Sequence, residues 1–189
     1  MTTAPAPHTW AGNFPAPIKL APPGKPYSPN PNIARVIGNA MGQVGFVEGV
    51  NNDNPYGAHF GINHQPYCAL GVSWAFNQAS LGSLIKGQYD WGFAECEGAY
   101  QIFLKEGLIL PPGVKAKAGD IALWAWDNPT HAEHTELIVA DEDIHGLTLV
   151  GWNTSPDHAT GSQANGGGCY LRHRSRYGLR GIVRPKYPQ

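Results

Sequence analysis

One cysteine of the chain lies where a thiol could act as a nucleophile. Residues 65–74 read QPYCALGVSW, and Cys68 lies at the start of a run of apolar residues with helical spacing. In the first turn of a helix, unpaired backbone N–H groups and the helix dipole favour a thiolate and lower the pKa of a thiol. The same N–H groups can hold the oxyanion that forms when a thiolate attacks a carbonyl. The sequence therefore predicts a nucleophile at Cys68.

The other two cysteines, Cys96 and Cys169, fit a different role. Three cysteines cannot all pair within one chain, and their wide spacing lacks the CxxC repeat of a structural zinc site. Cys96 lies in the middle of the helix expected around AECEGAYQIF, where a cysteine is usually a small buried hydrophobic residue. We therefore expect Cys96 and Cys169 to be dispensable for chemistry.

A nucleophilic thiolate also needs an imidazole as its base and a third group that orients the ring. Two histidines, His131 and His134, precede the apolar run LIVA, and Asn153 ends the next apolar run, LVGWN. If the two runs pair as an antiparallel hairpin, His134 and Asn153 become neighbours. Taken alone, Asn153 would more simply cap a turn, so its role depends on the rest of the pattern.

The first half of the chain is predicted to be mainly helical. Apolar residues recur at helical spacing in residues 32–44, with Asn32 as the expected N-cap, and again in residues 66–80 and 93–106. Residues 51–64 are rich in Asn and Gly and are predicted to form a loop that leads to the cysteine.

The second half changes character after the turn at residues 111–113. Short runs rich in β-branched and aromatic residues are separated by turn signals, which indicates an antiparallel sheet. These runs are AGDIALWAW, HTELIVA, GLTLVGWN and LRGIVRPKY. Helices followed by strands predict an α+β fold.

Residues 1–31 differ from the rest because they hold roughly half of the 17 prolines. Proline fixes φ and removes a backbone donor, so we expect an extended N-terminal arm with Trp10 and Phe14 as local anchors. One catalytic domain is expected to follow at residues 32–189. The start of the chain lacks the charged and apolar regions of a secretory signal, and no stretch has the length of a membrane span, which predicts synthesis in the cytoplasm.

The overall charge argues against a nucleic acid as partner, because proteins that bind nucleic acids usually carry a basic excess. The formal net charge is -1, and 14% of the residues are charged. The chain is rich in glycine, proline and tryptophan, which suits an enzyme with loops around a cleft. We expect any polymeric partner to be recognised by shape, aromatic contact and hydrogen bonding.

In their order and spacing, the motifs of residues 35–187 resemble the CHAP family of cysteine- and histidine-dependent amidohydrolases and peptidases, which have a papain-like core. No single motif is specific, but the ordered set is. The motifs are Glu48…Asn52…Tyr56-Gly57…Phe60-Gly61, Tyr67-Cys68-Ala69…Val72-Ser73-Trp74, Ala118-Gly119-Asp120-Ile121, His134…Leu137-Ile138-Val139, Gly151-Trp152-Asn153-Thr154-Ser155 and Gly166-Gly167-Gly168-Cys169-Tyr170…Arg174…Gly181-Ile182-Val183-Arg184-Pro185…Tyr187. The resemblance implies N-terminal helices followed by a twisted antiparallel sheet.

The same resemblance implies a set of site residues. Cys68 would be the nucleophile, His134 the general base and Asn153 the residue that orients the imidazole. Backbone N–H groups at Cys68 would stabilise the oxyanion. Further oxyanion and substrate contacts are expected at Gln65, Tyr67 and Trp152. Neither a metal nor a cofactor is implied.

Three positions depart from the family pattern. Tyr67 replaces a tryptophan that many members carry, and it keeps an aromatic ring there. Glu136 replaces the small glycine of His-x-Gly-Ile-Val and brings a carboxylate close to the histidine. Gly151 replaces a glutamate that some members carry two residues before the asparagine. It therefore stays open whether Asn153 orients the imidazole alone or together with Glu133 or Glu136.

The resemblance implies a peptidoglycan hydrolase that cleaves an amide bond of the bacterial cell wall. Its partner would be bacterial peptidoglycan, with no nucleic acid and no membrane, and we expect a monomer. A bacteriophage lysin of this kind is made in the host cytoplasm without a signal peptide and acts on the wall after release. The bond that is cut, by an amidase or an endopeptidase, and the target species stay open.

Two interpretations from other classes also stay open. A zinc hydrolase would use His131 and His134 with His59 or His64, although the chain has no HExxH motif. A wall-binding module without activity would keep the fold, although it would have no need of the retained catalytic set. A calcium site at residues 51–54 has weak support, because one carboxylate and three amides are few ligands for a hard cation.

Overall fold

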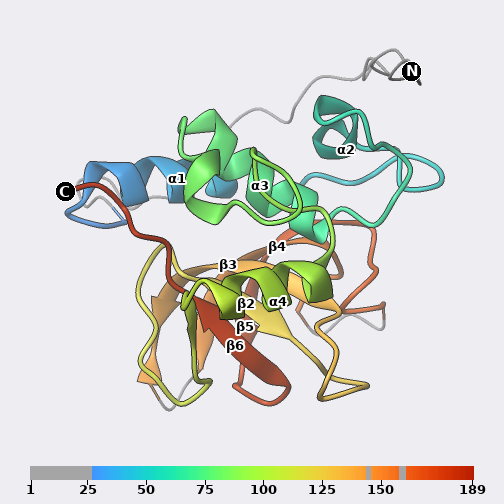
Figure 1. The fold of residues 1–189 in the computed structure, drawn as a ribbon. Coiled ribbons are helices and arrows are strands. Elements are labelled where there is room, and N and C mark those ends of the chain that lie inside the picture. Colours follow the sequence, from blue (N-terminus) through green and yellow to red (C-terminus); the bar gives the residue numbers. More distant parts are fainter. Residues whose placement is uncertain (1–26, 144–145, 158–160) are drawn as a thin grey trace.

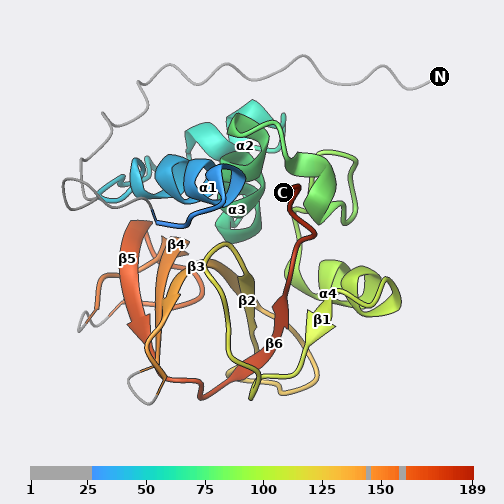
Figure 2. The same ribbon diagram turned by 90° about the vertical axis from the view of Figure 1, so that its left-hand side faces the viewer.

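The computed structural model describes residues 27–143, 146–157 and 161–189 and places several helices over a six-stranded sheet (Figures 1 and 2). The helices are α1 (Pro31–Met41), α2 (Pro55–His59), α3 (Cys68–Gln78), the short 3-10 helix η1 (Gly82–Ile85) and α4 (Cys96–Lys105). The strands are β1 (Ile109–Leu110), β2 (Ile121–Trp124), β3 (His134–Asp141), β4 (Leu147–Thr154), β5 (Gly168–Arg174) and β6 (Leu179–Val183). Most of the expected N-terminal arm, with Trp10 and Phe14, lies outside the described residues.

The sheet is antiparallel, with the strand order β1-β6-β2-β3-β4-β5. Four strands, β2, β3, β4 and β6, lie in the runs that the sequence pattern predicts, so the expected α+β class is confirmed. The sequence pattern did not predict β5, because charged side chains interrupt its apolar residues, and the two-residue β1 is too short to produce a pattern.

The first helix begins earlier than predicted. Pro31 is its first residue, and the N-cap is Asn30 instead of Asn32. The Asn30 side chain accepts hydrogen bonds from the backbone N–H groups of Asn32 at 2.8 Å and Ile33 at 3.4 Å. Proline explains the earlier start, because the N–H group of the first helical residue makes no hydrogen bond within the helix, so a residue without this group fits there. Asn30 and Pro31, which the sequence pattern places in the arm, therefore belong to the start of α1.

Two further helices also differ from the prediction. Residues 51–64 are not all loop, because α2 lies within them and Asn54 caps its N-terminus. α4 begins at Cys96, and its N-cap is Glu95. Cys96 is therefore in the first turn of its helix and not in the middle, so the reason for treating it as an ordinary core cysteine does not hold.

The main core fills the space between the helices and the sheet. α3 is buried along almost its whole length and packs against β3 and β4. The strands contribute Leu137, Val150 and Trp152 to this core. A second and smaller apolar cluster, which includes Ile138 and Leu149, lies on the other face of the sheet, as the alternation of side chains along a strand requires.

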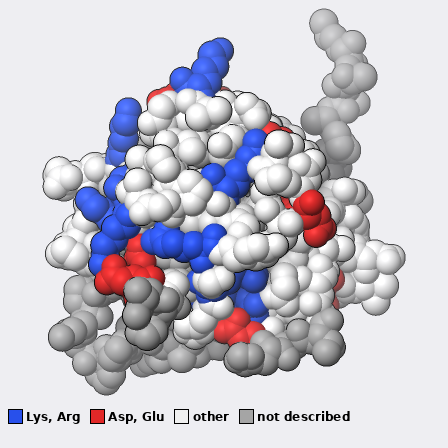
Figure 3. Space-filling model, turned by 90° about the horizontal axis from the view of Figure 1, so that it is seen from below, with Lys and Arg blue, Asp and Glu red and all other residues white. Residues whose placement is uncertain are grey.

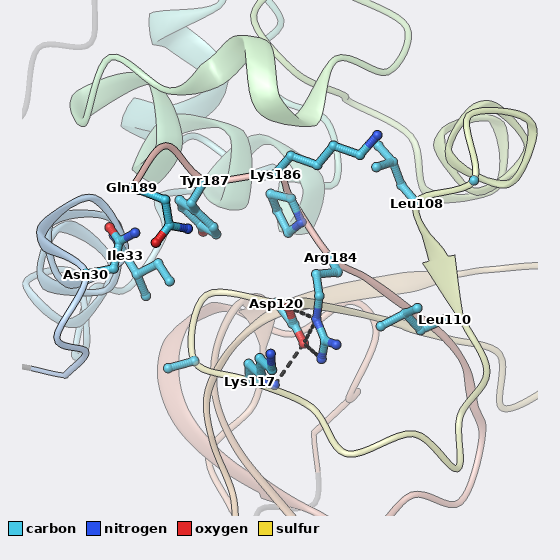
Figure 4. Close-up of a pocket in the computed structure, with 13 residues that line it drawn as sticks. Asn30, Ile33, Leu108, Leu110, Lys117, Asp120, Arg184, Lys186, Tyr187 and Gln189 are labelled. Atoms are coloured by element: carbon cyan, nitrogen blue, oxygen red, sulfur yellow. Dashed lines mark hydrogen bonds and ion pairs between the residues drawn. The ribbon is translucent and has the colours of Figure 1, made fainter.

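The C-terminal segment ties the sheet to the helices, and Figure 4 shows its residues beside α1. The Arg184 guanidinium pairs with the carboxylate of Asp120 at 2.7 Å, directly before β2. The amide of Asn30 donates a hydrogen bond to the carbonyl of Pro188 at 2.8 Å. Asp120 is almost completely buried and belongs to one of the family-like motifs, so that motif has a structural role here.

A glycine brings α3 close to β4. A Cβ atom built on Gly71 would lie 2.2 Å from Cγ of Trp152, far inside a normal contact distance. Trp152 is completely buried, so its ring has little room to move. The contact sets the distance between α3 and the sheet, and with it the position of Cys68 about one turn earlier.

The substitution Gly71→Ala should destabilise the protein, because the added methyl group has to displace the Trp152 ring or the helix. Overpacking of this kind costs about 1–3 kcal/mol. Gly38→Ala is the matched control: Gly38 lies in α1 with nothing within 4 Å of its Cβ position. Alanine there should stabilise the helix by about 0.5–1 kcal/mol. Urea unfolding followed by circular dichroism measures both changes, and wild-type stability of Gly71→Ala would contradict the close approach.

Candidate active site

Cys68 is the first residue of α3 and lines a cavity. The N-cap residue, Tyr67, makes no side-chain hydrogen bond to the helix, so it leaves the N–H groups of the first turn uncapped. Cys68 is 5% exposed and borders a cavity of about 440 Å³ together with Gln65, His131 and Glu133. This is the environment that the sequence predicts for a nucleophilic thiol.

His134 is the first residue of β3 and is completely buried. Its Nε2 atom lies 3.4 Å from Oε1 of Glu136, whereas its Nδ1 atom has no hydrogen-bond partner among the described residues. The ring lies beside Trp126, with the two ring centroids 5.8 Å apart. Because the carboxylate holds Nε2, Nδ1 is the nitrogen that is left to exchange a proton with Cys68.

Cys68 and His134 change each other's proton affinity. A hydrogen bond from Cys96 is the main cause that lowers the pKa of Cys68 well below its ordinary value; burial opposes it, and His134 lowers it further. Burial would lower the pKa of His134, but Cys68 and Glu136 raise it to about 9. Both shifts favour the form of the pair with a thiolate on Cys68 and an imidazolium on His134.

Glu136 is placed to orient the imidazole, because its Oε1 atom contacts Nε2 of His134. It follows His134 by two residues on β3, so the two side chains lie on the same face of the strand. Arg174 of β5 holds its carboxylate with two hydrogen bonds, Nε to Oε2 at 2.6 Å and Nη2 to Oε1 at 2.8 Å. Burial would raise the pKa of Glu136, but His134 and Arg174 lower it to about 2, so the group stays ionised.

The neighbouring strand leaves room for this carboxylate. Glu136 pairs with Gly151 across β3 and β4, and a Cβ atom on Gly151 would lie 2.3 Å from Oε1 of Glu136. Glu136 and Gly151, two of the positions at which the sequence departs from the CHAP pattern, thus lie opposite each other on neighbouring strands.

The orienting role expected of Asn153 stays a prediction, and its buried Oδ1 atom has no hydrogen-bond partner among the described residues. The β3–β4 hairpin is confirmed, but Asn153 has a φ of 54°, in the left-handed region. Its amide nitrogen donates to the side chain of Asn165 at 3.2 Å and to the carbonyl of Ala164 at 3.4 Å. Among the described residues it makes no hydrogen bond to His134. The turn of the backbone at this strand end directs the amide to the following loop.

Two of the three expected substrate contacts are core residues. Tyr67 is completely buried and stacks on Tyr56, with ring centroids 5.8 Å apart. Trp152 is also completely buried and lies against Gly71. Neither ring has an exposed surface for a substrate in this structure, because both fill the interior under α3. Gln65 is exposed and lines the cavity of Cys68, and its oxyanion role stays a prediction.

Sequence reasoning missed two members of the site, Arg174 and Cys96. Arg174 reaches Glu136 from a strand that the sequence pattern did not predict. The Sγ atom of Cys96 lies 3.8 Å from that of Cys68, which no spacing in the sequence indicates. For Glu136, which the sequence left open as a partner of the imidazole, strand spacing was a signal, because a residue two positions after the histidine lies on the same face of the strand.

The described residues offer no donor set for a metal ion. Among them, no group of three or more His, Cys, Asp or Glu side chains is arranged to hold one. His59 and His131 are exposed, and neither belongs to a cluster of this kind. In the segment considered for calcium, the Asp53 carboxylate accepts a hydrogen bond from Asn63 at 2.6 Å. Neither the zinc interpretation nor the calcium site gains support here.

A second cavity of about 450 Å³ lies beside the C-terminal segment (Figure 4). Its lining residues include no cysteine or histidine; of its charged residues, Asp120 and Arg184 pair with each other, and Lys117 and Lys186 also line it. The face of the molecule seen in Figure 3 carries Lys and Arg next to Asp and Glu, without a large area of one sign. Neither feature competes with the cavity at Cys68 as a site of chemistry.

Comparisons of the chain with family models, with curated proteins and with solved structures found no match. Within the described ranges, no helix is both long enough and apolar enough to cross a lipid bilayer. The candidate site therefore stands on its own geometry and on the order of the sequence motifs.

The substitution Glu136→Gln should lower the pKa of His134. It keeps the shape of the side chain but removes the anion that helps to raise this pKa to about 9. The imidazolium should then lose its proton at a pH lower by about one unit or more. NMR of the imidazole nitrogens follows the titration directly.

The matched control is Glu133→Gln. The Glu133 carboxylate accepts hydrogen bonds from the backbone N–H groups of Trp126 at 2.6 Å and Asp127 at 3.2 Å and makes none to His134. Its removal should leave the His134 titration in place. An unchanged midpoint in Glu136→Gln, or an equal shift in both variants, would contradict the orienting contact.

Proposed function

We propose that the protein is a cysteine-dependent peptidoglycan hydrolase of the CHAP type. One observation carries the proposal: Cys68 lies at the N-terminus of α3, where the N-cap residue makes no side-chain hydrogen bond, and it interacts with His134, which contacts Glu136, the partner of Arg174. The cavity beside Cys68 gives a substrate carbonyl access to the thiolate. The ordered motifs that resemble the CHAP family supply the substrate class, an amide bond of the bacterial wall. A lysin made in a phage-infected host and released to the wall fits this activity.

Acylation begins when the thiolate of Cys68 attacks the carbonyl carbon of the amide. Backbone N–H groups in the first turn of α3 stabilise the negative charge that develops on the carbonyl oxygen. The imidazolium of His134 then gives its proton to the amide nitrogen. The C–N bond breaks, the amine leaves, and the acyl group remains on Cys68 as a thioester.

Deacylation uses the neutral His134 that the first step leaves behind. The imidazole takes a proton from a water molecule, and the resulting hydroxide attacks the thioester carbonyl. Cys68 leaves as a thiolate, the product is released as a carboxylic acid that gives its proton to the solvent, and His134 is again an imidazolium. Glu136 keeps the ring oriented and stabilises its cationic form at both stages, because its own pKa of about 2 keeps it ionised.

The products identify the bond. An amidase frees the N-terminus of the peptide stem and leaves a sugar without peptide, whereas an endopeptidase creates a new N-terminus inside the peptide. Mass spectrometry of purified peptidoglycan after digestion distinguishes the two.

The substitution Cys68→Ala should reduce wall hydrolysis by roughly a thousandfold or more, because it removes the covalent step. The fall in turbidity of a bacterial suspension measures hydrolysis, and circular dichroism checks the fold. Cys169→Ala is the matched control, since Cys169 is a free, buried cysteine of β5. Equal loss in both variants with intact folds would contradict the assignment.

Two inhibitors separate the proposal from its alternatives in the same assay. Iodoacetamide should stop hydrolysis and EDTA should not. A zinc hydrolase would give the opposite result, and a wall-binding module would show no hydrolysis in any arm.

The substitution His134→Ala should abolish hydrolysis, whereas His131→Ala should keep most of it. His134 contacts Glu136 and interacts with Cys68, while His131 is exposed and its backbone N–H bonds to Asn128 at 2.9 Å. Initial rates from the turbidity assay decide between them. Loss of activity in His131→Ala alone would place the base three residues earlier.

A further inference from the structure

Cys68 has a second thiol as its neighbour. The Sγ atoms of Cys68 and Cys96 lie 3.8 Å apart, although the residues are 28 positions apart in the chain. Both are free cysteines, and each is the first residue of a helix, α3 and α4 respectively. Both border the same cavity of about 440 Å³, so a small molecule that enters it lies beside both residues.

The N-termini of the two helices differ in their N-caps. The N-cap of α3 makes no side-chain hydrogen bond to the helix, whereas Glu95 closes the N-terminus of α4. The Glu95 carboxylate accepts hydrogen bonds from the N–H groups of Glu97 and Gly98, both at 2.6 Å. This carboxylate neutralises the positive end of α4 next to Cys96, so the proton is expected on Cys96 and the negative charge on Cys68.

The directions of the two pKa values agree with this charge distribution. The contact with Cys68, burial and the nearby carboxylates Glu95 and Glu97 raise the pKa of Cys96 well above its ordinary value. The pair thus consists of a reactive thiolate and a protonated thiol in contact with it. A reactive thiolate with a second thiol in reach is the arrangement that yields an intramolecular disulfide after oxidation.

We propose that Cys68 and Cys96 form a redox modification site, in which a peroxide converts the pair to a disulfide and an external dithiol restores it. Closing the bond brings the sulfur atoms about 1.8 Å nearer to each other than their present 3.8 Å. In the disulfide form Cys68 has no thiolate, so wall hydrolysis stops. This last consequence rests on the proposed function, whereas formation of the bond does not.

The chemistry balances with hydrogen peroxide as the oxidant. The Cys68 thiolate attacks one peroxide oxygen, the O–O bond breaks, and the products are a sulfenic acid and hydroxide, which is protonated to water. The Cys96 sulfur then attacks the sulfenic sulfur, the S–O bond breaks, and the departing hydroxide takes the Cys96 proton as water. Two thiols and one peroxide thus give one disulfide and two waters.

The test treats the full chain with hydrogen peroxide, blocks remaining thiols with iodoacetamide and measures intact mass and peptide maps. Before alkylation, the disulfide should lower the mass by about 2 Da, and a peptide linking Cys68 to Cys96 should appear and vanish with dithiothreitol. Cys169→Ser should behave in the same way. Cys96→Ser, checked by Cys96→Ala and by circular dichroism, should form no link. Instead it should gain about 32 or 48 Da at Cys68, which dithiothreitol does not reverse.

The outcomes separate the two proposals. A wild-type protein that passes directly to the sulfinic or sulfonic acid, or that links Cys68 to Cys169 or to a second chain, would overturn the redox site. The mass measurement needs no substrate. A protein that forms the reversible link but never hydrolyses peptidoglycan would therefore overturn the proposed function and leave the redox site standing.

Discussion

The buried carboxylate of Glu136 is the constraint on which the site depends. A carboxylate without exposed surface is stable only if cations and donors surround it, and Arg174 and His134 do so here. The result is a line of alternating charges, from the Cys68 thiolate through the His134 imidazolium and Glu136 to Arg174. Each charged group offsets the free-energy cost of burying its neighbour. The reactivity of the thiol and the stability of this part of the sheet therefore depend on the same contacts.

Two glycines permit the close packing around these charged groups. Gly71 lets α3 lie directly on Trp152, and Gly151 leaves the space that the Glu136 carboxylate occupies. Protein interiors have few voids, so a side chain at either position would have to move a neighbour.

Two cysteines at equivalent helix positions differ in proton affinity because a hydrogen bond from Cys96 and the nearby His134 lower the pKa of Cys68, whereas the contact with Cys68, burial and nearby carboxylates raise that of Cys96. The N-terminus of α3 has no side-chain cap, and the N-terminus of α4 is closed by Glu95. Of the two sulfur atoms in contact, that of Cys96 holds the proton more strongly than that of Cys68. Residue type and helix position alone do not decide which thiol reacts, because the local charge does.

The sequence by itself determined what depends on near neighbours in the chain. The start of an apolar helical run placed Cys68 in a first turn, and strand alternation with a turn between two runs predicted the β3–β4 hairpin that carries His134. Only the tertiary structure decided which groups meet these two residues. Arg174 reaches Glu136 across 38 positions and Cys96 reaches Cys68 across 28, and packing under α3 made core residues of Tyr67 and Trp152. Local spacing fixes the face on which a side chain lies, but strand order, register and helix packing bring distant faces together, and these emerge only when the whole chain folds.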